Sequence, residues 1–201
     1  MIIIFHKNNK VVQVYDYSLS KELAITGNTI QGVLVLVASK YKSRFIGWCH
    51  HNLRESLNLT AWDTIFKHEL LMVSYETSNK FYITSDIGFV EDTPFIKINK
   101  DVEYPTWLMS SDVGMAHASV LIKYQNLLKY QLSFNLFLTT IAKVGMSEGL
   151  LCYSNPFLLK NSNVKIHKKN ASKIEMLQFI KSTYKARWVL LYAFNHLIYN
   201  T

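Results

Sequence analysis

The chain has 201 residues, 49% of them hydrophobic, and a formal net charge of +8, which suits one domain with a substantial core. Seven glycines and three prolines argue against disorder and against a turn-rich β-sandwich, and two cysteines are too few for a disulfide scaffold. The apolar N-terminus is too short for a signal peptide, and no apolar run reaches the roughly 20 residues that cross a bilayer. We therefore expect a cytoplasmic protein in which Cys49 and Cys152 are buried free thiols.

The first half of the chain alternates between short β-rich runs and helical patterns. A polar turn separates residues 2–5 from residues 11–15, which predicts a β-hairpin. Asn28 is the predicted N-cap of a helix that reaches residue 40, and Thr60 is the predicted cap of a short helix. Further strands of this half are predicted at residues 45–49, 70–75, 81–83 and 94–98.

The second half of the chain is mostly helical. Helices are predicted at residues 112–124, 134–144, 172–183 and 185–199, with one short buried strand at residues 149–153. Strands that come early and helices that come late favour an α/β fold in which helices flank a mixed sheet. We expect an α/β domain over residues 1–159 and a basic helical C-terminal segment over residues 160–201 that packs on it.

Several common functional motifs are absent from the sequence. It has no Gly-x-Gly-x-x-Gly and no Walker loop, which argues against a Rossmann dehydrogenase and a P-loop enzyme. The possible metal ligands among the histidines are His50, His51, His68 and His117, and His51 is the candidate retained. They lack the spacing of a zinc site, so the favoured interpretation is exposed or hydrogen-bonded histidines at a strand end. The paired carboxylates Glu91 and Asp92 are candidates for metal binding or acid–base chemistry, but a solvated loop before proline also explains them and is the favoured interpretation.

The most site-like stretch covers residues 104–117. Ser110, Ser111 and Asp112 stand at the start of the predicted helix, where free backbone N–H groups attract anions. The flat face of Trp107 suits a sugar ring or a base. The residues predicted to line a pocket for a polar ligand are Trp107, Ser110, Ser111, Gly114 and His117. The alternative is that Asp112 serves only as the N-cap of the helix.

Positive charge is concentrated between Lys160 and Arg187. This segment holds eight Lys and Arg and one acid, Glu175, whereas the rest of the chain holds 14 basic and 13 acidic residues. The segment leads into an aromatic-rich apolar run at residues 187–194, a pattern typical of a peripheral helix on anionic lipid. We therefore predict that residues 160–199 contact the inner face of a membrane. A packed C-terminal helix with a solvated approach remains the alternative.

From Trp48 onward, the order of features resembles the GT-A type glycosyltransferases of family 2. In that family a central strand ends in an acidic metal-binding triplet, a small-residue acceptor loop leads into a helix, and an Arg-Trp motif precedes an interfacial helix. The stretches that carry the resemblance are residues 45–52 (FIGWCHHN), 70–75 (LLMVSY), 110–115 (SSDVGM), 134–138 (FNLFL), 149–156 (GLLCYSNP) and 184–188 (YKARW).

The resemblance implies a nucleotide-diphospho-sugar transferase-like fold. It also implies the transfer of a sugar from a nucleotide-sugar donor to a glycan acceptor, in the synthesis of a cell-surface glycan or polysaccharide. Inverting transfer needs a base, for which Asp112 is the candidate, while Arg187 and Trp188 match the Arg-Trp motif and Arg187 would assist the leaving diphosphate.

The position of the metal-binding triplet departs from the family. It holds His50, His51 and Asn52, without a carboxylate. Mg²⁺ and Mn²⁺ prefer oxygen ligands, and of the two Mn²⁺ tolerates this set better. The missing carboxylates leave open a non-catalytic binding or interaction domain on a degenerate version of the fold. A basic α/β domain that contacts nucleic acid through residues 160–187 is a third alternative, which the absence of a nucleic-acid motif disfavours.

Overall fold

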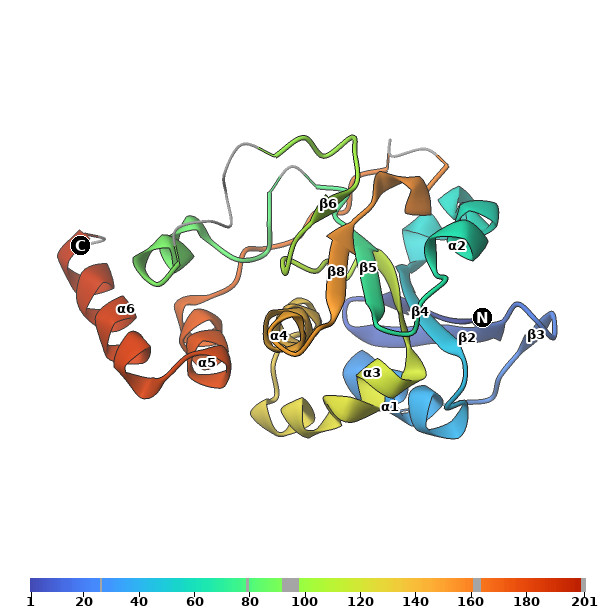
Figure 1. Cartoon of the computed structure of the whole chain (residues 1–201), viewed down its shortest axis with the longest axis horizontal. Coiled ribbons are helices and arrows are strands. Elements are labelled where there is room, and N and C mark those ends of the chain that lie inside the picture. Colours follow the sequence, from blue (N-terminus) through green and yellow to red (C-terminus); the bar gives the residue numbers. More distant parts are fainter. Residues whose placement is uncertain (26, 79, 92–97, 161–163, 200–201) are drawn as a thin grey trace.

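A computed structural model gives the fold and describes residues 1–25, 27–78, 80–91, 98–160 and 164–199 (Figure 1). The described strands form one eight-stranded mixed sheet in the order β3-β2-β1-β4-β7-β5-β8-β6. They are β1 (Ile2–Lys7), β2 (Lys10–Asp16), β3 (Lys21–Glu22), β4 (Phe45–His50), β5 (Leu71–Tyr75), β6 (Tyr104–Pro105), β7 (Val113–His117) and β8 (Leu151–Ser154). The predicted α/β class and mixed sheet are confirmed.

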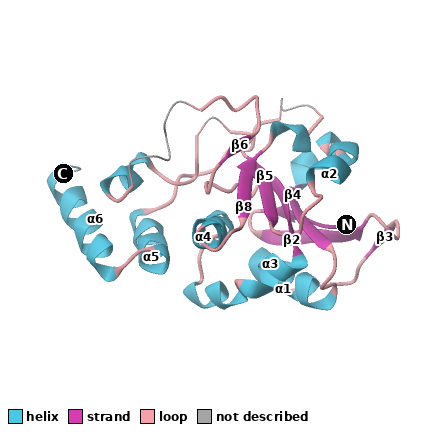
Figure 2. Cartoon of the chain, in the orientation of Figure 1, coloured by secondary structure: helices cyan, strands magenta, loops and turns pink. Residues whose placement is uncertain are grey.

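Helices flank the sheet and form an arm at one end of the molecule (Figure 2). The α-helices are α1 (Ile30–Lys40), α2 (Leu59–Ile65), α3 (Ala118–Lys123), α4 (Phe134–Met146), α5 (Lys173–Thr183) and α6 (Ala186–Tyr199). Short 3-10 helices are η1 (His51–Ser56), η2 (Ser85–Phe89), η3 (Gln125–Tyr130) and η4 (Pro156–Leu158). The predicted helical C-terminus is therefore confirmed.

Strands β1 and β2 form the predicted hairpin. Asn8 and Asn9 in its turn have φ angles of 50° and 60°, a left-handed conformation that asparagine tolerates better than most other residues. β1 also pairs in parallel with β4, and this register sets His6 beside His50. The hairpin thus brings a histidine from the start of the chain to the edge where β4 ends.

Strand β7 runs antiparallel between β4 and β5, whereas β1, β4, β5 and β8 all run in the other direction. The carboxyl ends of those four strands and the start of β7 therefore meet at one edge of the sheet. The predicted helix at residues 112–124 is wrong over its first half, because only residues 118–123 are helical. All five residues of β7 are buried, so this strand lacks the alternation that identifies a strand with one exposed face.

The sheet separates two hydrophobic clusters. Ile2 and Ile4 pack with residues of α1, α3 and α4, whereas Ile3 and Phe5 pack on the other face with Trp62 of α2. This alternation follows from the period of two along a strand. Both cysteines lie in these clusters as buried free thiols, as predicted.

The C-terminal arm consists of α5 and α6. α5 begins with a capping box, in which the Ser172 and Glu175 side chains each bind the other residue's backbone N–H. Phe179 of α5 is buried and stacks on Trp107 with 5.9 Å between ring centroids. α6 contacts α5 and η2 and lies farther from the sheet (Figure 1).

Some predicted boundaries differ from the structure. Thr29 rather than Asn28 caps α1, because its side chain accepts the hydrogen bond of the Gly32 N–H. The N-cap of α2 is Asn58 rather than Thr60. Residues 81–83 form no strand, since the segment packs its aromatic rings against the core instead. The predicted strand at residues 94–98 lies mostly outside the described residues.

Candidate functional site

A cavity of about 470 Å³ opens at the edge where β1 and β4 end and β7 begins. Ligand pockets commonly measure ~300–1,000 Å³, and ligands of α/β sheets bind beyond the carboxyl ends of the strands. The lining residues are mostly polar: His6, Asn8, Asn9, His50, Tyr82, Ser111, Asn135, Ile166, His167, Lys168, Lys169, Asn170, Ser172 and Glu175. The strand directions therefore place a polar cavity where this class of sheet usually binds its ligand.

The lining is rich in cations and hydrogen-bond donors. Lys168 and Lys169 are adjacent, and three histidines accompany them. Among the described lining residues the one acid is Glu175, which accepts hydrogen bonds from the Tyr82 hydroxyl at 2.7 Å and from the Ser172 N–H and hydroxyl, both at 2.8 Å. These neutral donors orient the carboxylate but leave its charge in place, so Lys169, which has no salt bridge among the described residues, is the cation through which the cavity can hold an anionic ligand such as a phosphate group.

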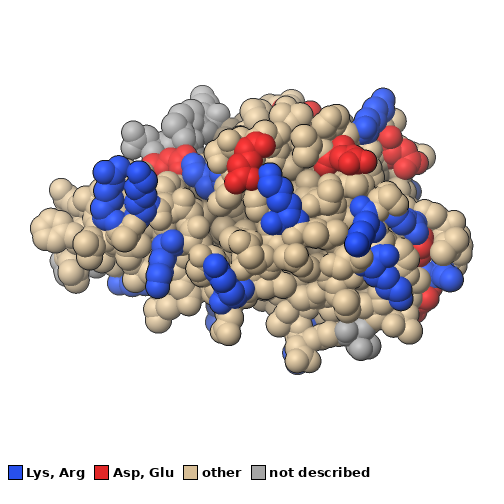
Figure 3. All heavy atoms as spheres, turned by 60° about the horizontal axis from the view of Figure 1, so that its bottom comes forward, with Lys and Arg blue, Asp and Glu red and all other residues tan. Residues whose placement is uncertain are grey.

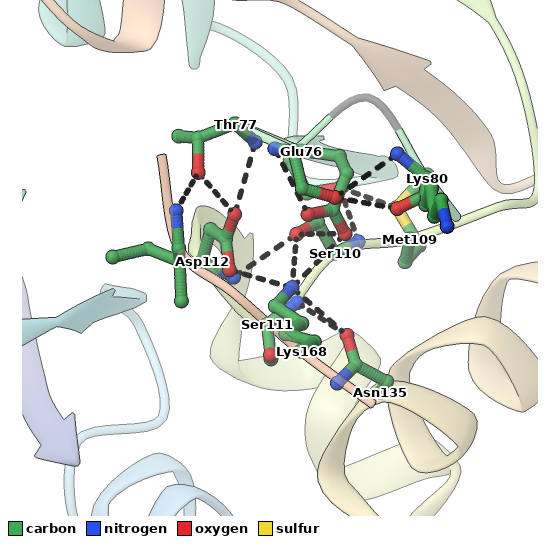
Figure 4. A network of polar contacts seen from close by, with 12 residues as sticks. Glu76, Thr77, Lys80, Met109, Ser110, Ser111, Asp112, Asn135 and Lys168 are labelled. Carbon is green, nitrogen blue, oxygen red and sulfur yellow. Dashed lines mark hydrogen bonds and ion pairs between the residues drawn. The ribbon is translucent and has the colours of Figure 1, made fainter. Parts of the chain in front are cut away.

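Next to the cavity, a buried ion cluster joins Glu76, Asp112 and Lys168, which lie far apart in the sequence (Figure 4). Lys168 Nζ lies 2.5 Å from Asp112 Oδ1 and 2.9 Å from Glu76 Oε2, and it donates to Ser110 Oγ at 3.1 Å. The exposed fractions of the Glu76, Asp112 and Lys168 side chains are 8%, 0% and 14%. Removal of one partner from such a cluster leaves a buried charge without compensation.

Asp112 is bound on both carboxylate oxygens. Its Oδ2 accepts hydrogen bonds from the Thr77 N–H at 2.9 Å and the Thr77 hydroxyl at 2.7 Å, while Oδ1 faces Lys168. Burial is the largest effect on Asp112 and opposes its charge, but the Lys168 ammonium together with the hydrogen bonds from Thr77 and Glu76 holds the pKa of Asp112 below the usual value. Burial raises the pKa of Glu76, despite the same ammonium. Asp112 is therefore an ionised carboxylate that anchors the structure.

The loop that leads into β7 is fixed through its backbone. Trp48 Nε1 donates to the Ser110 carbonyl at 2.9 Å, and the Ser110 N–H donates to Ser74 Oγ at 2.9 Å. The Ser111 N–H donates to Asn135 Oδ1 at 3.0 Å, which ties the loop to the first turn of α4. These bonds satisfy backbone groups that burial removes from water. The loop forms a rigid wall of the cavity.

Part of the predicted site lies at this cavity. Ser111 lines it, while Ser110 and Asp112 take part in the ion cluster and its hydrogen bonds. Gly114 lies inside the sheet, where a Cβ atom would approach Trp48 to 2.4 Å and the Val73 carbonyl oxygen to 2.7 Å. Glycine is needed there for the close packing of β7 against its neighbours.

Other predicted residues lie away from the cavity. His117 ends β7, and its side chain accepts a hydrogen bond from the Ser119 N–H as the N-cap of α3. The five steps along the strand from Asp112 to His117 cover about 16 Å at ~3.3 Å per residue, so His117 is at the opposite edge of the sheet from Asp112. Trp107 is buried against Phe179. His117 was grouped with the site because residues 113–117 were expected to be helical, and Trp107 because its flat ring suits a sugar or a base.

The donors at the end of β4 do not fit a divalent metal ion. His51 is exposed on η1, and His50 Nδ1 accepts a backbone hydrogen bond at 3.3 Å. The two carboxylates of the ion cluster already bind a lysine, although Mg²⁺ and Mn²⁺ need such oxygens. Within the described ranges, no three His, Cys, Asp or Glu side chains gather around a common point. We therefore assign no step to a metal ion. Arg187 and Trp188, at the start of α6, also do not line the cavity.

Three lining residues were not predicted from the sequence: His6, Asn135 and Lys168. His6 meets His50 only through the pairing of β1 with β4. Lys168 lies in the basic segment at residues 160–187, but the sequence around it does not distinguish it from the other lysines of that segment. One available signal was a polar residue at the end of an otherwise apolar strand, which is the position of His6 after residues 2–5.

We compared the chain with known proteins by sequence and by fold. It matches no protein-family model, no curated protein and no solved structure. The cavity, its cationic lining and the ion cluster beside it are therefore the basis for a proposal about function.

Proposed function

We propose that the chain binds a nucleotide sugar in this cavity and transfers the sugar to a glycan acceptor, in the synthesis of a cell-surface glycan or polysaccharide. The supporting observation is the lining itself, in which lysines, imidazoles, amides and hydroxyls surround a space whose single described acid is already bound. A diphosphate requires cations and N–H donors, and sugar hydroxyls require amide and hydroxyl partners. The order of sequence features that resembles family 2 supports the same proposal.

Lys169 is the cation that we assign to the diphosphate. Lys168 beside it is engaged by the carboxylates of Glu76 and Asp112, whereas Lys169 is exposed and has no salt bridge within the described part of the chain. An ammonium group without a carboxylate partner can bind a phosphate oxygen without breaking an existing ion pair. The division gives one lysine a structural role and the next a binding role.

A nucleoside diphosphate is expected to raise the melting temperature of the protein. A ligand at ~100 times its Kd stabilises the folded state by about 2.7 kcal/mol, and for a chain of this size ~1 kcal/mol corresponds to about 2–4 °C. We therefore expect a rise of about 5–10 °C in a thermal-shift screen with UDP, GDP, CDP and their sugars, for one nucleotide in preference to the others. No rise with any of them would contradict the proposal.

Two lysine variants sharpen this test. Lys169→Glu should abolish most of the nucleotide-induced rise, since it places a carboxylate where the diphosphate binds. Lys173→Glu is the matched control, because Lys173 is also exposed in the same basic segment but does not line the cavity. Equal losses in the two variants would show that net charge alone, rather than the cavity, attracts the nucleotide.

A binding domain without catalysis is the second candidate function. It is favoured by the state of Asp112, whose two oxygens are held by Thr77 and Lys168 and which does not line the cavity. A protein of this kind would show the nucleotide-induced rise but no hydrolysis or transfer of the bound nucleotide sugar. Product analysis after incubation with the nucleotide sugar that binds best separates the two functions.

The outward side of α6 carries an exposed apolar surface. Leu190, Leu191, Phe194, Leu197 and Ile198 are exposed by 74%, 39%, 62%, 68% and 51%. Their spacing puts them on one face of the helix, which we call the α6 face. Apolar side chains that are exposed together usually mark an interaction surface.

Charge around the α6 face favours an anionic membrane as its partner. The α6 face is preceded by three basic residues, Lys181, Lys185 and Arg187, and α6 contains no acidic residue. Figure 3 shows Lys and Arg side chains over the end of the molecule that the arm forms. Helices of this kind lie in the plane of a membrane surface, and no described helix is long and apolar enough to cross one. We propose peripheral attachment through residues 160–199, with the α6 face against the lipid.

Substitution of the α6 face is expected to weaken vesicle binding strongly. The wild type should sediment with vesicles of phosphatidylcholine and phosphatidylserine more than with phosphatidylcholine alone. Leu190→Ser with Phe194→Ser should reduce that binding at least ~10-fold, because each buried side chain of this size contributes ~1.5–3 kcal/mol. Leu19→Ser with Leu36→Ser is the control, since both leucines are similarly exposed elsewhere. If the wild type instead binds no vesicles but forms a dimer, and the same pair of substitutions breaks that dimer, the α6 face would be assigned to contact with a second copy.

A further inference from the structure

Two histidines from neighbouring strand ends meet at the wall of the cavity. His6 of β1 and His50 of β4 are paired in register, and their rings lie edge to face with 5.6 Å between centroids. Both line the cavity. The His6 ring is also held edge to face against Phe134 of α4 at 5.4 Å. Packing from two elements therefore fixes the orientation of this imidazole.

The hydrogen bond of His6 determines which ring nitrogen carries the proton. His6 Nε2 lies 2.8 Å from the carbonyl oxygen of Ser111. A carbonyl oxygen only accepts, so the hydrogen lies on Nε2 and the lone pair of a neutral ring lies on Nδ1. Nδ1 has no hydrogen-bond donor among the described residues. Burial lowers the pKa of His6 to about 4, so its ring is neutral at pH 7.

His50 has the opposite arrangement. Its Nδ1 accepts a hydrogen bond from the Asn52 N–H at 3.3 Å, so the proton of the neutral ring lies on Nε2. Burial also lowers the pKa of His50. The two rings thus offer one acceptor, His6 Nδ1, and one donor, the His50 Nε2–H. An acceptor hydroxyl beside the donor's phosphate offers the complementary groups, namely a hydrogen for His6 Nδ1 and an oxygen for the His50 Nε2–H.

The carboxylates near the cavity are not free to act as a base. Asp112 is bound by Thr77 and Lys168, and Glu76 accepts from Lys168 and from the Ser110 hydroxyl. Glu175 is bound by Tyr82 and Ser172. Among the described lining residues, His6 Nδ1 is the buried base that has no donor of its own.

We propose that His6 is the general base of the sugar transfer and that His50 donates a hydrogen bond to the diphosphate, an inference that rests on the proposed function. The acceptor hydroxyl gives its proton to His6 Nδ1 while its oxygen forms a bond to the anomeric carbon. The bond from that carbon to the diphosphate oxygen breaks, and its electron pair leaves with the diphosphate beside His50 and Lys169. The proton then passes from His6 to water.

A bound diphosphate makes this base stronger. The charged and titratable groups that act on His6 are His50, Lys168 and Asp112, and Phe134 and the Ser111 carbonyl complete its surroundings. An added anion favours the imidazolium form and therefore raises the pKa of His6. The base gains proton affinity only when the donor substrate is present, which suits a group that must accept a proton during transfer.

The test combines NMR spectroscopy of the histidine rings with kinetics. In protein labelled with ¹⁵N in histidine, His6 should show a protonated Nε2 and a bare Nδ1 at pH 7. Its pKa should rise when the nucleoside diphosphate of the thermal-shift screen is added. A proton on Nδ1, or a pKa that the nucleotide leaves unchanged, would overturn the inference whether or not turnover is measurable.

His6→Gln should lower the rate of sugar transfer or donor hydrolysis ~10²–10⁴-fold, the usual contribution of a general base. The glutamine amide can still donate to the Ser111 carbonyl, so the nucleotide-induced rise in melting temperature should persist. His68→Gln is the control, since His68 is exposed and does not line the cavity. Full activity of His6→Gln with nucleotide binding intact would refute the role of His6 as general base but would leave the proposed function standing. Failure of the wild type to bind any nucleotide would remove the proposed function, and this step with it.

Discussion

Lys168→Met is expected to lower the free energy of unfolding by about 3–5 kcal/mol at neutral pH, which is the typical result of breaking a buried ion pair from one side. The substitution keeps much of the volume of the lysine stem but removes the ammonium that Glu76 and Asp112 share. Both carboxylates are almost fully buried, so water cannot replace the lost partner. Urea unfolding followed by circular dichroism measures the difference.

The loss should depend on pH. In the wild type the lowered pKa of Asp112 gives stability above its unfolded pKa of about 3.8, and this stability is lost as the pH falls through the folded pKa. Without Lys168, burial should raise the pKa of Asp112 above the unfolded value. The folded variant then binds protons more tightly than the unfolded chain, so its stability rises as the pH is lowered from 7 towards 4.

Two further variants complete this test. Lys169→Met should change the stability by less than ~0.5 kcal/mol, because Lys169 is exposed. Adding Asp112→Asn and Glu76→Gln to Lys168→Met should recover part of the loss, since no buried charge is then left unpaired. A pH-independent loss that the added changes do not reduce would show that Lys168 acts through packing.

Gly114→Ala is expected to destabilise the protein by about 3 kcal/mol, at the upper end of the usual effect of overpacking. The new Cβ atom would approach the Trp48 ring to 2.4 Å and the Val73 carbonyl oxygen to 2.7 Å. Trp48 is buried and its Nε1 is hydrogen-bonded to Ser110, so neither neighbour moves freely. Thermal unfolding measures the change.

Gly88→Ala is the matched control, because no atom beyond its chain neighbours and its own helix backbone lies within 4 Å of the Cβ position of Gly88. Its stability should stay within ~0.5 kcal/mol of the wild type. The pair also separates two roles for Gly114. A structural glycine gives an unstable variant, whereas a glycine that contacts the ligand gives a stable variant with weaker nucleotide binding.

The elements that could be predicted were those whose local pattern agrees with their place in the fold. The hairpin was predicted from a polar turn between two β-rich runs, and the helix predicted at residues 172–183 is α5. β7 could not be predicted in this way. Its sequence, Val-Gly-Met-Ala-His, is buried throughout, and its conformation depends on pairing with β4 and β5 on either side.

The site was predictable only in part for the same reason. Ser110, Ser111 and Asp112 were identified by their polarity, but the helix expected after them would have directed Gly114 and His117 to the cavity as well. The roles of His6 and Lys168 depend on contacts across 105 and 92 positions of the sequence, to Ser111 and Glu76. No local pattern of residues encodes such contacts.

The position of Lys168 in the chain sets the order in which a nascent protein can complete this site. Every described strand of the sheet precedes Lys168, so a ribosome releases the two carboxylates well before their cation. Until then Glu76 and Asp112 must remain hydrated or protonated, and the entry to β7 cannot be closed. We infer that the sheet forms first as an incomplete scaffold and that arrival of the segment around Lys168 locks it. The cavity wall that contains Lys168 is therefore complete only after every described strand of the sheet has been synthesised.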